Sequence, residues 1–361
     1  VHFFDGYRTS HELQKIELLD RDVMQAMLPA ERVRAHRRRR LDPERPVIRG
    51  TAQNPDVFFR GREAASPYYR AAVDHVVAAM ATLAEMTGRR YAPVRYHGHP
   101  RADRVLVVMG SAAAVARATA TTMAEAGDRV GVLSVSLYRP WPAEHVRAAL
   151  PAGVRVLGVL DRCKEPGAPG EPLYQDVVAT VAEAVAGGAW SGEPPRITGT
   201  RYGLGGKDFT PAMVRALFAD LATARGGEHT TIGIDDDRSG SSIAWDATAV
   251  DEDPESWTAL LFARGGDGTV GAAGNTVRIV GDARQLQVQG FAEYDSRRAG
   301  AITVSHLRIG GDPAQKCYRI GRARLVAVHA FDLLGRIPVC TRLEPGGTLL
   351  LNSPYPASRV W

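Results

Sequence analysis

The sequence predicts an α/β protein of more than one domain, with a doubly wound parallel sheet at its centre. Four short apolar runs, at 105–109, 130–137, 154–160 and 197–202, alternate with segments of helical character. Continuous apolar runs are typical of strands buried on both faces, and this alternation is typical of parallel sheets. A chain of 361 residues is long enough for about two or three domains of ordinary size.

The segment before this sheet has a less regular pattern. Residues 1–5 have the composition of a strand, and Ser10 is a suitable N-cap for a helix over 10–19. A second helix is expected over 23–28. Residues 41–66 are rich in Pro and Arg and lack periodicity, which predicts a long loop of the kind that often serves function.

The clearest helix predicted in the chain runs from Ser66 to the residue before Gly88. Ser66 is the expected N-cap, Pro67 lies in the first turn, and Gly88 ends the helix. Residues 89–104 resemble a linker. The central domain then follows, with its last helix beginning at Thr210.

A third unit is predicted after the linker-like residues 222–228. Its expected strands are short: 230–234, 260–263, 277–280, 325–328 and 349–351, with Val339 in a further one. They surround a glycine loop, 265–275, and a basic Gly- and Ser-rich stretch, 292–310. Such loops at strand ends present N–H groups and cations to anions, but they are also ordinary surface turns.

Composition argues against a membrane-spanning protein and against a nucleic-acid-binding one. The formal net charge is +5, with 45% hydrophobic and 24% charged residues, and no apolar run is long enough to span a membrane. Arg37–Arg40 lacks interleaved aromatic residues, so it is interpreted as the solvated end of a helix rather than a nucleic-acid site. Cys163, Cys317 and Cys340 form no C-x-x-C pair, which suits core residues in a reducing cytoplasm.

Several motifs have both a chemical and a structural interpretation. Gly110–Ser111 opens a helix as a phosphate turn does, but it lacks G-x-G-x-x-G. The loop 161–165 could hold catalytic groups or solvated charges. Asp235–Asp237 could bind a divalent cation or form a turn. Gly266–Gly268 looks like the start of a thiamine diphosphate motif, but no asparagine pair follows, so the Mg²⁺ ligands are incomplete.

The chain resembles the pyruvate:ferredoxin (flavodoxin) oxidoreductase family from end to end, as an internal fragment. The phrases that carry the resemblance are FFDGYRTSHELQKIE, RPVIRGTAQNPDVFFRGREA, VLDRCKEPGAPGEPLYQDV, RYGLGGKDFTPAMV, GDGTVGAAGN, YDSRRAGAITVSHLR and LLLNSPY. The resemblance implies three domains. Residues 1–100 would close a thiamine-pyrimidine-type domain, 101–225 would form a transketolase C-terminal-like domain, and 229–361 would form most of a coenzyme A lid.

The family implied by this resemblance oxidatively decarboxylates pyruvate with coenzyme A to acetyl-CoA and CO₂. Thiamine diphosphate, Mg²⁺ and iron–sulfur clusters do this chemistry, and electrons pass to ferredoxin or flavodoxin. Those cofactors would lie mainly on parts absent from these 361 residues, so the isolated chain is expected to be inactive, without catalytic or metal-binding residues of its own. The complete enzyme would be a cytoplasmic homodimer that binds neither nucleic acid nor membrane.

The residues implied to contact coenzyme A lie in the third domain. They are Ser239, Gly240, Ser241, Ser242 and Ile243, a turn whose hydroxyl and N–H groups suit phosphates and amides.

The family also has a lysine where this chain has Gly274, so one cation of that site is missing here. The alternatives are a sibling enzyme for another 2-oxoacid, a non-catalytic remnant that binds coenzyme A or only has a structural role, and a nucleotide-binding regulator at Gly110.

Overall fold

The computed structural model describes residues 6–48, 50–223, 229–235, 238–249, 255–284, 286–294, 300–312 and 316–359. The chain divides into two compact units. The larger unit comprises Val1–Ile16, Tyr96–Ser134 and Leu150–Trp361, and the smaller comprises Glu17–Arg95 and Val135–Ala149. The predicted strand over 1–5 lies outside the described residues.

A seven-stranded sheet forms the centre of the chain, and its order is β2-β4-β3-β5-β6-β7-β8. The strands are β2 (Val94–Gly98), β3 (Arg104–Met109), β4 (Val130–Val135), β5 (Val156–Asp161), β6 (Arg196–Tyr202), β7 (Thr230–Ile232) and β8 (Ser242–Ile243). The pairs from β3 through β5, β6 and β7 to β8 are parallel. The predicted doubly wound parallel sheet is therefore confirmed.

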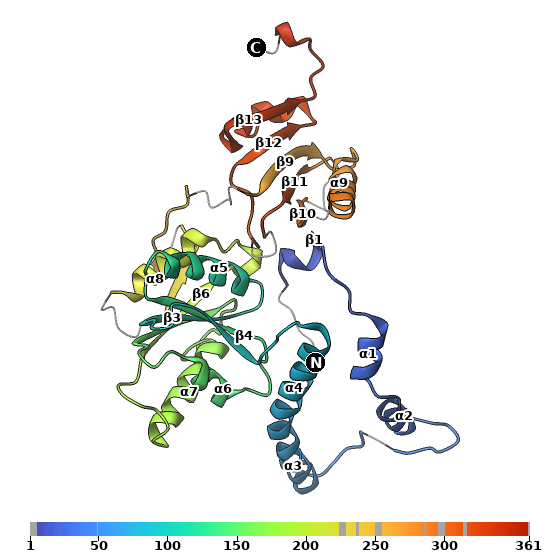
Figure 1. Cartoon of the computed structure of the whole chain (residues 1–361), viewed down its shortest axis with the longest axis vertical. Helices are drawn as coiled ribbons and strands as arrows, with labels where there is room; N and C mark the ends of the chain where they lie inside the picture. The colour runs from blue at the N-terminus through green and yellow to red at the C-terminus, as the bar shows by residue number, and fades with distance from the viewer. Residues whose placement is uncertain are drawn as a thin grey trace. The chain divides into compact units, whose positions relative to one another are not determined.

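Helices cover both faces of this sheet (Figure 1). On one face, α5 (Ala112–Glu125) and α8 (Pro211–Leu221) contact each other and β3; on the other, α7 (Pro172–Ala186) contacts β5 and β6. Four consecutive residues of β3, from Val105 to Val108, are completely buried. A strand with both faces covered must be apolar at every position, which explains why this run has no alternation.

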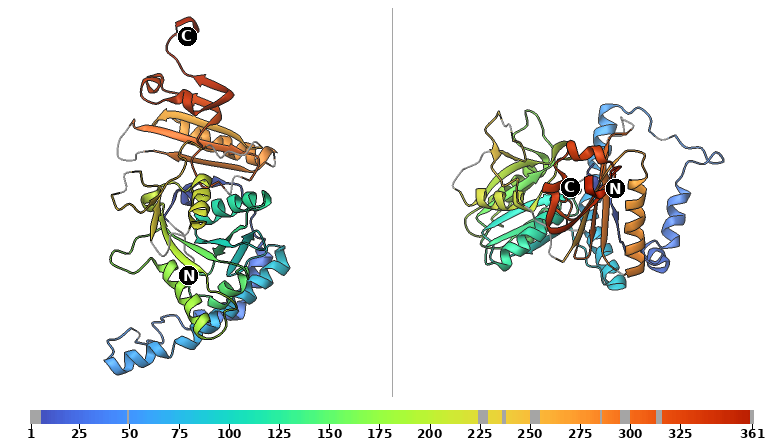
Figure 2. Two further views of the ribbon diagram at one scale, coloured as in Figure 1. Left: turned by 90° about the vertical axis from the view of Figure 1, so that its left-hand side faces the viewer. Right: turned by 90° about the horizontal axis from the view of Figure 1, so that it is seen from above.

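A six-stranded mixed sheet carries the C-terminal part of the chain, in the order β1-β10-β11-β9-β12-β13. Its strands are β1 (Leu13–Gln14), β9 (Trp257–Arg264), β10 (Val288–Glu293), β11 (Ile302–Ile309), β12 (Ala323–Val328) and β13 (Leu343–Leu351). The strands from β1 to β9 pair antiparallel, whereas β12 is parallel to β9 and β13. Helix α9 (Thr269–Arg284) lies along one face (Figure 2).

The strand predicted over 277–280 is wrong, because these residues belong to α9. Ala273 and Val277 are four residues apart and both pack against the sheet, which is the spacing of a helix face. The glycine loop is correspondingly shorter than predicted and ends at Gly268. Most of the described part of the basic stretch 292–310 is strand, with Asp295–Ala299 outside the described residues.

The secondary structure predicted near the N-terminus is also wrong, because tertiary contacts determine the conformation there. The helix expected over 10–19 is instead a 3-10 turn, η1 (Arg8–His11), followed by strand β1. Leu13 pairs with Gly290 of β10, so a distant strand determines the local conformation. The 89–104 linker contains β2, and Val339 lies in the 3-10 helix η5 (Val339–Arg342) rather than in a strand.

The smaller unit is largely helical. It contains α1 (Arg21–Met27), α2 (Ala30–Arg38), α3 (Pro55–Glu63), α4 (Ser66–Thr87) and α6 (Ala143–Ala149). The predicted helix to Gly88 is confirmed, and Gly88 ends it at φ 73°, but Ser66 is not its cap, because Ala65 holds that position without a capping side chain. The predicted loop 41–66 is wrong over Pro55–Glu63, because these residues form helix α3. Asn54 caps the N-terminus of that helix.

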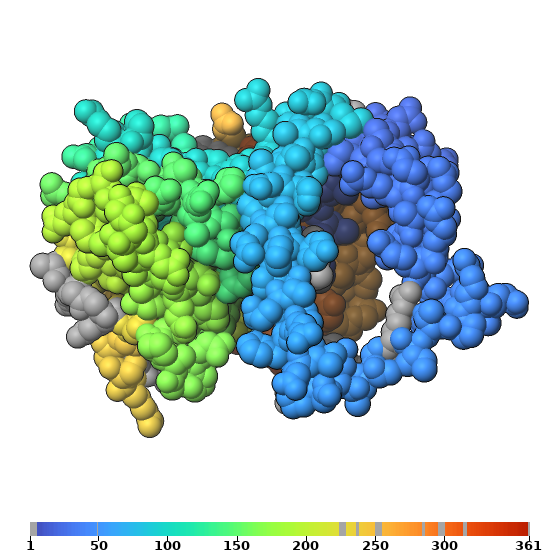
Figure 3. All heavy atoms as spheres, turned by 90° about the horizontal axis from the view of Figure 1, so that it is seen from below, coloured from blue at the N-terminus to red at the C-terminus, as the bar shows by residue number. Residues whose placement is uncertain are grey.

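Helices α1 to α4 have no buried residue. The light-blue atoms of α3 and α4 lie at the surface in the view of Figure 3, and apolar side chains of these helices, such as Phe59, are exposed. Arg37 and Arg38 belong to the last turn of α2, Arg39 caps its end, and all four arginines from Arg37 to Arg40 are exposed, as predicted for a solvated helix end. No helix among the described residues has the length and apolar character needed to cross a membrane.

Strands β7 and β8 continue the seven-stranded sheet past residue 225, where the predicted second domain ends. Thr230 and Ser242 therefore lie in the same sheet as the central parallel strands. The division of the chain at residues 100 and 225 stays a prediction.

Replacing Gly290 with alanine is expected to lower the free energy of unfolding by about 1–2 kcal/mol, because the new Cβ overpacks the sheet against α9. It would lie 2.6 Å from Val277 Cγ2 and 3.2 Å from Leu307 Cδ2. Gly271→Ala is the control, since its Cβ meets nothing within 4 Å. Urea denaturation of both variants tests this, and equal stabilities would contradict it.

Candidate functional site

The serine turn predicted to contact coenzyme A leads into and includes β8, the edge strand of the seven-stranded sheet, which follows β7 in the chain. Ser239 and Gly240 are exposed, and Gly240 adopts φ 65°, a conformation that favours glycine. The adjoining surface has a hollow of about 380 Å³, which we call the serine hollow. Its lining residues are Ile234, Asp235, Gly240, Ser242, Ile243, Ala244, Trp245 and Ala247.

The hydroxyl groups of the serine turn already have hydrogen-bond partners, in the turn itself and in the residues just before it. Ser241 Oγ lies 2.8 Å from Ser239 Oγ and 3.3 Å from Thr231 Oγ1, and Ser242 Oγ donates to the carbonyl oxygen of Ile234 at 2.9 Å. These bonds fix the orientation of the hydroxyl groups, and each oxygen keeps the capacity to accept a further bond. The turn can therefore present ordered acceptors to a ligand that donates hydrogen bonds.

Gly274 lies elsewhere, in α9 beside the six-stranded sheet. It lines a separate hollow of about 270 Å³, which we call the glycine hollow. The lining residues are His11, Leu13, Val270, Ala273, Gly274, Gly290, Phe291, Ala292, Tyr294, Ser305 and Leu307. The two hollows share no described lining residue, so the structure does not bring Gly274 together with the serine turn.

Two acidic residues from the motifs of the sequence have structural roles. Asp161, at the end of β5, accepts hydrogen bonds from the N–H groups of Leu173 and Tyr174 at 3.0 and 3.1 Å, at the start of α7. Asp267 accepts from Thr269 N–H at 2.9 Å and Arg264 N–H at 3.1 Å. Burial alone would raise the pKa of Asp267, but these N–H groups hold it below its usual value.

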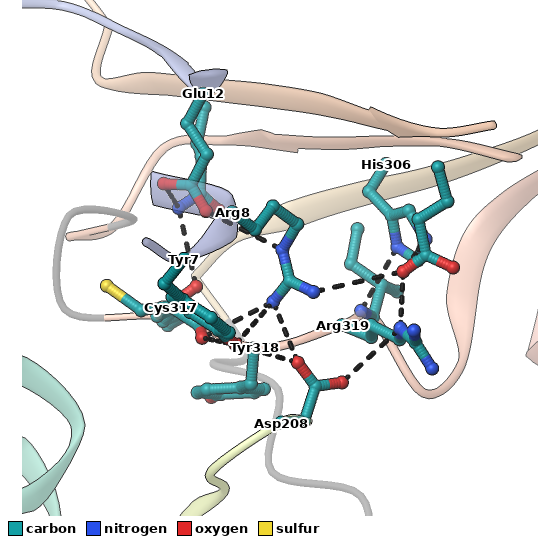
Figure 4. A network of polar contacts seen from close by, with 12 residues as sticks. Tyr7, Arg8, Glu12, Asp208, His306, Cys317, Tyr318 and Arg319 are labelled. Atoms are coloured by element: carbon teal, nitrogen blue, oxygen red, sulfur yellow. Dashed lines mark hydrogen bonds and ion pairs between the residues drawn. The ribbon is translucent and has the colours of Figure 1, made fainter. Parts of the chain in front are cut away.

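Sequence reasoning missed a buried polar cluster around Arg8 (Figure 4). Arg8 Nη2 lies 2.9 Å from Asp208 Oδ1, and it also donates to Tyr7 Oη at 3.0 Å and to the carbonyl oxygen of Cys317 at 3.3 Å. The Tyr7 hydroxyl is 2.8 Å from both Asp208 Oδ1 and the Cys317 carbonyl, and donates to one of them. The partners are about two hundred and three hundred residues apart along the chain, so no local pattern could predict the cluster.

Further charges extend the cluster on both sides. Glu12 Oε1 and Glu293 Oε1 each lie 3.8 Å from Arg8, while Arg319 pairs with Asp208 at 3.5 Å and also with Glu293. Burial raises the pKa of Glu12 above its usual value, and burial with the Asp208 charge raises the pKa of Tyr7. Tyr7 therefore stays a neutral phenol in the cluster, and Asp208 accepts the hydrogen bond from Arg8.

A third hollow, of about 700 Å³, adjoins this cluster, and we call it the arginine hollow. It is lined by Gly6, Tyr7, Arg8, Ser10, His11, Gly205, Gly206, Ala292, Glu293, Tyr294 and Arg319. His11, Ala292 and Tyr294 also line the glycine hollow, so the two spaces adjoin each other. Glu293 and Asp208 largely neutralise the two guanidinium groups, and the arginine hollow is therefore not a strong anion site.

Comparison with known proteins places the whole chain in one family. Three family models match in order: pyruvate flavodoxin/ferredoxin oxidoreductase, thiamine diphosphate-binding, over residues 1–81; pyruvate:ferredoxin oxidoreductase core domain II over 102–214; and pyruvate ferredoxin/flavodoxin oxidoreductase over 258–360. The pyruvate-flavodoxin oxidoreductase of Nostoc sp. is 45% identical over 100% of this chain. The chain belongs to the pyruvate flavodoxin/ferredoxin oxidoreductase family.

Other relatives agree with this family assignment. The probable pyruvate-flavodoxin oxidoreductase of Escherichia coli (strain K12) and the pyruvate:ferredoxin oxidoreductase of Moorella thermoacetica are each 44% identical over 100% of this chain. The chain spans only 30–31% of the length of these relatives. A solved structure, the pyruvate oxidoreductase subunit PORC of Thermotoga maritima, matches 29% of this chain and 55% of its own at 24% identity, with a TM-score of 0.25.

The Arg8 cluster joins all three segments of the chain that the family models match. Tyr7 and Arg8 belong to the first, Asp208 to the second, and Cys317 and Arg319 to the third. Gly274 also lies in the third matched segment, whereas the serine turn lies between the second and third. The family models therefore do not test the serine turn.

The first family model is named for thiamine diphosphate, a cofactor whose diphosphate is bound together with Mg²⁺. Mg²⁺ needs clustered oxygen ligands, and the described ranges contain no group of three His, Cys, Asp or Glu side chains that could hold a metal ion. Helices α1 to α4, within residues 1–87, bury no side chain that could enclose a cofactor. The three cysteines likewise lie apart from one another in the sequence, as free thiols.

Proposed function

We propose that this chain acts as part of an enzyme that oxidatively decarboxylates pyruvate with coenzyme A. The products would be acetyl-CoA and CO₂, and two electrons would pass to ferredoxin or flavodoxin. The observation that carries the proposal is about 45% identity over the whole chain to enzymes named for this reaction. Thiamine diphosphate, Mg²⁺ and iron–sulfur clusters would be bound by other parts of a cytoplasmic, homodimeric enzyme.

The contribution of these residues would be a scaffold and part of the coenzyme A site. In this proposal the serine turn, Ser239–Ile243, contacts the amide-containing arm of coenzyme A rather than its phosphates. Asp235 lines the same hollow with an exposed carboxylate, which disfavours a nearby phosphate, while Lys207 at 3.9 Å offsets part of that charge. Ordered serine oxygens and turn N–H groups suit amides.

A chimeric enzyme tests the proposed function. This chain would replace the aligned 361 residues of the E. coli enzyme, which it matches at 44% identity. We expect pyruvate- and coenzyme A-dependent reduction of a viologen dye, and no activity when the segment is deleted. A folded chimera that carries its cofactors but does not oxidise pyruvate would contradict the proposal.

Removing two serine hydroxyl groups, in Ser241→Ala with Ser242→Ala, is expected to weaken coenzyme A binding by about tenfold, as expected for losing one or two hydrogen bonds of ordinary strength. Calorimetry on the chimera measures the affinity. Thr248→Ala is the control, because its hydroxyl also lies in a turn, bonded to Asp246 at 2.7 Å, outside the serine hollow. Equal losses in both variants would count against the serine turn.

Introducing a cation at position 274 is expected to tighten coenzyme A binding. Gly274→Lys would place an ammonium group where the family resemblance implies one, and a charged hydrogen bond to phosphate is typically worth about tenfold or more in affinity. The matched control is Gly271→Lys, on an exposed position of the same helix that lines none of the three hollows. An equal gain in both variants would show only a general effect of net charge.

A further inference from the structure

Small residues line part of the glycine hollow on two facing elements, beside larger side chains such as Leu307, Phe291 and Tyr294. Its floor is the face of β10 and β11 toward α9, where Gly290 pairs with Leu307 and Ala292 pairs with Ser305. On the opposite wall α9 contributes Ala273 and Gly274. Small residues on two facing elements leave a flat-sided gap, which suits a planar group better than a branched one.

Gly290 and Gly274 contribute to this gap in different ways. A Cβ at Gly290 would clash with Val277, so close packing of the helix requires that glycine. A Cβ at Gly274 would meet only Leu13 Cδ1, at an ordinary 3.4 Å, so the fold does not require this glycine. A larger side chain at position 274 would instead occupy the hollow.

Ser305 contributes a polar group to an otherwise apolar wall. Its residue is 1% exposed, and its hydroxyl is buried without a hydrogen-bond partner. Buried hydroxyl groups in native proteins are nearly always paired, because leaving one unpaired is unfavourable. A ligand atom in the hollow would supply the missing partner.

Charge and size limit the class of ligand. None of the described lining residues is Asp, Glu, Lys or Arg, and His11 is the one histidine among them. The volume is about 270 Å³, whereas an apolar cavity of about 150 Å³ is enough for benzene. Leu13, Val270 and Tyr294 are exposed lining residues, which gives the hollow an open mouth for entry.

We propose that the glycine hollow binds a neutral bicyclic aromatic ring whose edge carries one hydrogen-bonding atom, and that this atom pairs with the Ser305 hydroxyl. The inference goes beyond the proposed function, although Gly274 belongs to both, and its probes are small aromatic rings rather than coenzyme A. It requires neither pyruvate oxidation nor coenzyme A binding, so a failure of its test can be told apart from a failure of the proposed function.

Indole and indene are suitable probes, because they share size and shape but only indole has an N–H group. Ligand-detected NMR titration of the 361-residue chain measures both. We expect both to bind. Ser305→Ala should weaken indole binding by about five- to tenfold, the loss expected for one neutral hydrogen bond, and should leave indene binding unchanged.

Gly274→Leu should abolish binding of both probes by filling the hollow. Gly271→Leu is its matched control, since it makes the same change on the exposed side of α9, and it should leave both affinities unchanged. The proposal is overturned if neither probe binds the unaltered chain. It is also overturned if Ser305→Ala weakens both probes equally, or if Gly271→Leu has the effect of Gly274→Leu.

Discussion

Replacing Arg8 with methionine is expected to lower the free energy of unfolding by about 3 kcal/mol, which is the cost of removing one partner from a buried ion pair. The Arg8 side chain is 8% exposed and lies between Asp208 and Glu12, whose side chains are 18% and 1% exposed. Without the guanidinium these carboxylates lose their nearest cation, and the Cys317 carbonyl oxygen loses a donor. Amide hydrogen exchange and urea denaturation measure the loss.

Arg319→Met is the matched control for this prediction. Arg319 pairs with the same Asp208 and Glu293, but its side chain is 55% exposed, and exposed ion pairs are worth about 0–1 kcal/mol. Adding Asp208→Asn to each variant completes a double-mutant cycle, in which Arg8 and Asp208 should show the larger coupling. If both arginine variants lost equal stability, burial would not be the cause of the effect.

The same cluster shows what sequence patterns could and could not predict. The central sheet was predicted correctly because its strands are continuous apolar runs, and α4 because Gly88 ends a long periodic segment. The cluster around Arg8 could not be predicted, since Asp208 and Cys317 approach it only through the tertiary fold. Local sequence patterns indicated the central sheet and α4, whereas no local pattern indicated the cluster around Arg8.

The errors have a common physical cause. Residues 277–280 have the composition of a strand, but Val277 packs with Ala273 as one face of a helix. Leu13 lies in a periodic segment, but pairing with Gly290 makes it a strand. In both cases the partner is a distant strand of the six-stranded sheet, and its contacts outweigh local propensity. The Ser239–Ile243 and Gly274 predictions came from resemblance, and the structure assigns them to separate hollows.

Acidification is expected to destabilise the six-stranded sheet through His306. This side chain is fully buried and stacks on Phe291, with ring centroids 4.5 Å apart. Its Nδ1 accepts a hydrogen bond from the N–H of Ile320 at 3.2 Å, so the neutral ring carries its proton on Nε2. A second proton would have to occupy Nδ1 and face that N–H group.

Burial is the main reason that the pKa of His306 lies well below its usual 6.5, and the charges of Arg308 and Arg8 lower it further. In the unfolded chain the ring takes up a proton as pH falls below 6.5, whereas in the folded protein it does not. The unfolded state then binds more protons, and folding stability falls with pH. The contribution is complete above pH 6.5 and is lost progressively below it.

Between the usual pKa of 6.5 and the lowered pKa of the folded state, the loss approaches about 1.4 kcal/mol for each pH unit. His306→Asn removes this dependence, because its amide does not titrate while Oδ1 can still accept from Ile320 N–H. Glu12 acts in the opposite direction, since burial raises its pKa, but it is common to both proteins and cancels in the comparison. Exchange rates of the β11 amides at several pH values give the two slopes. Parallel slopes for the two proteins would mean that the folded protein accommodates the imidazolium ion, and the buried arginines would then have to move away from it.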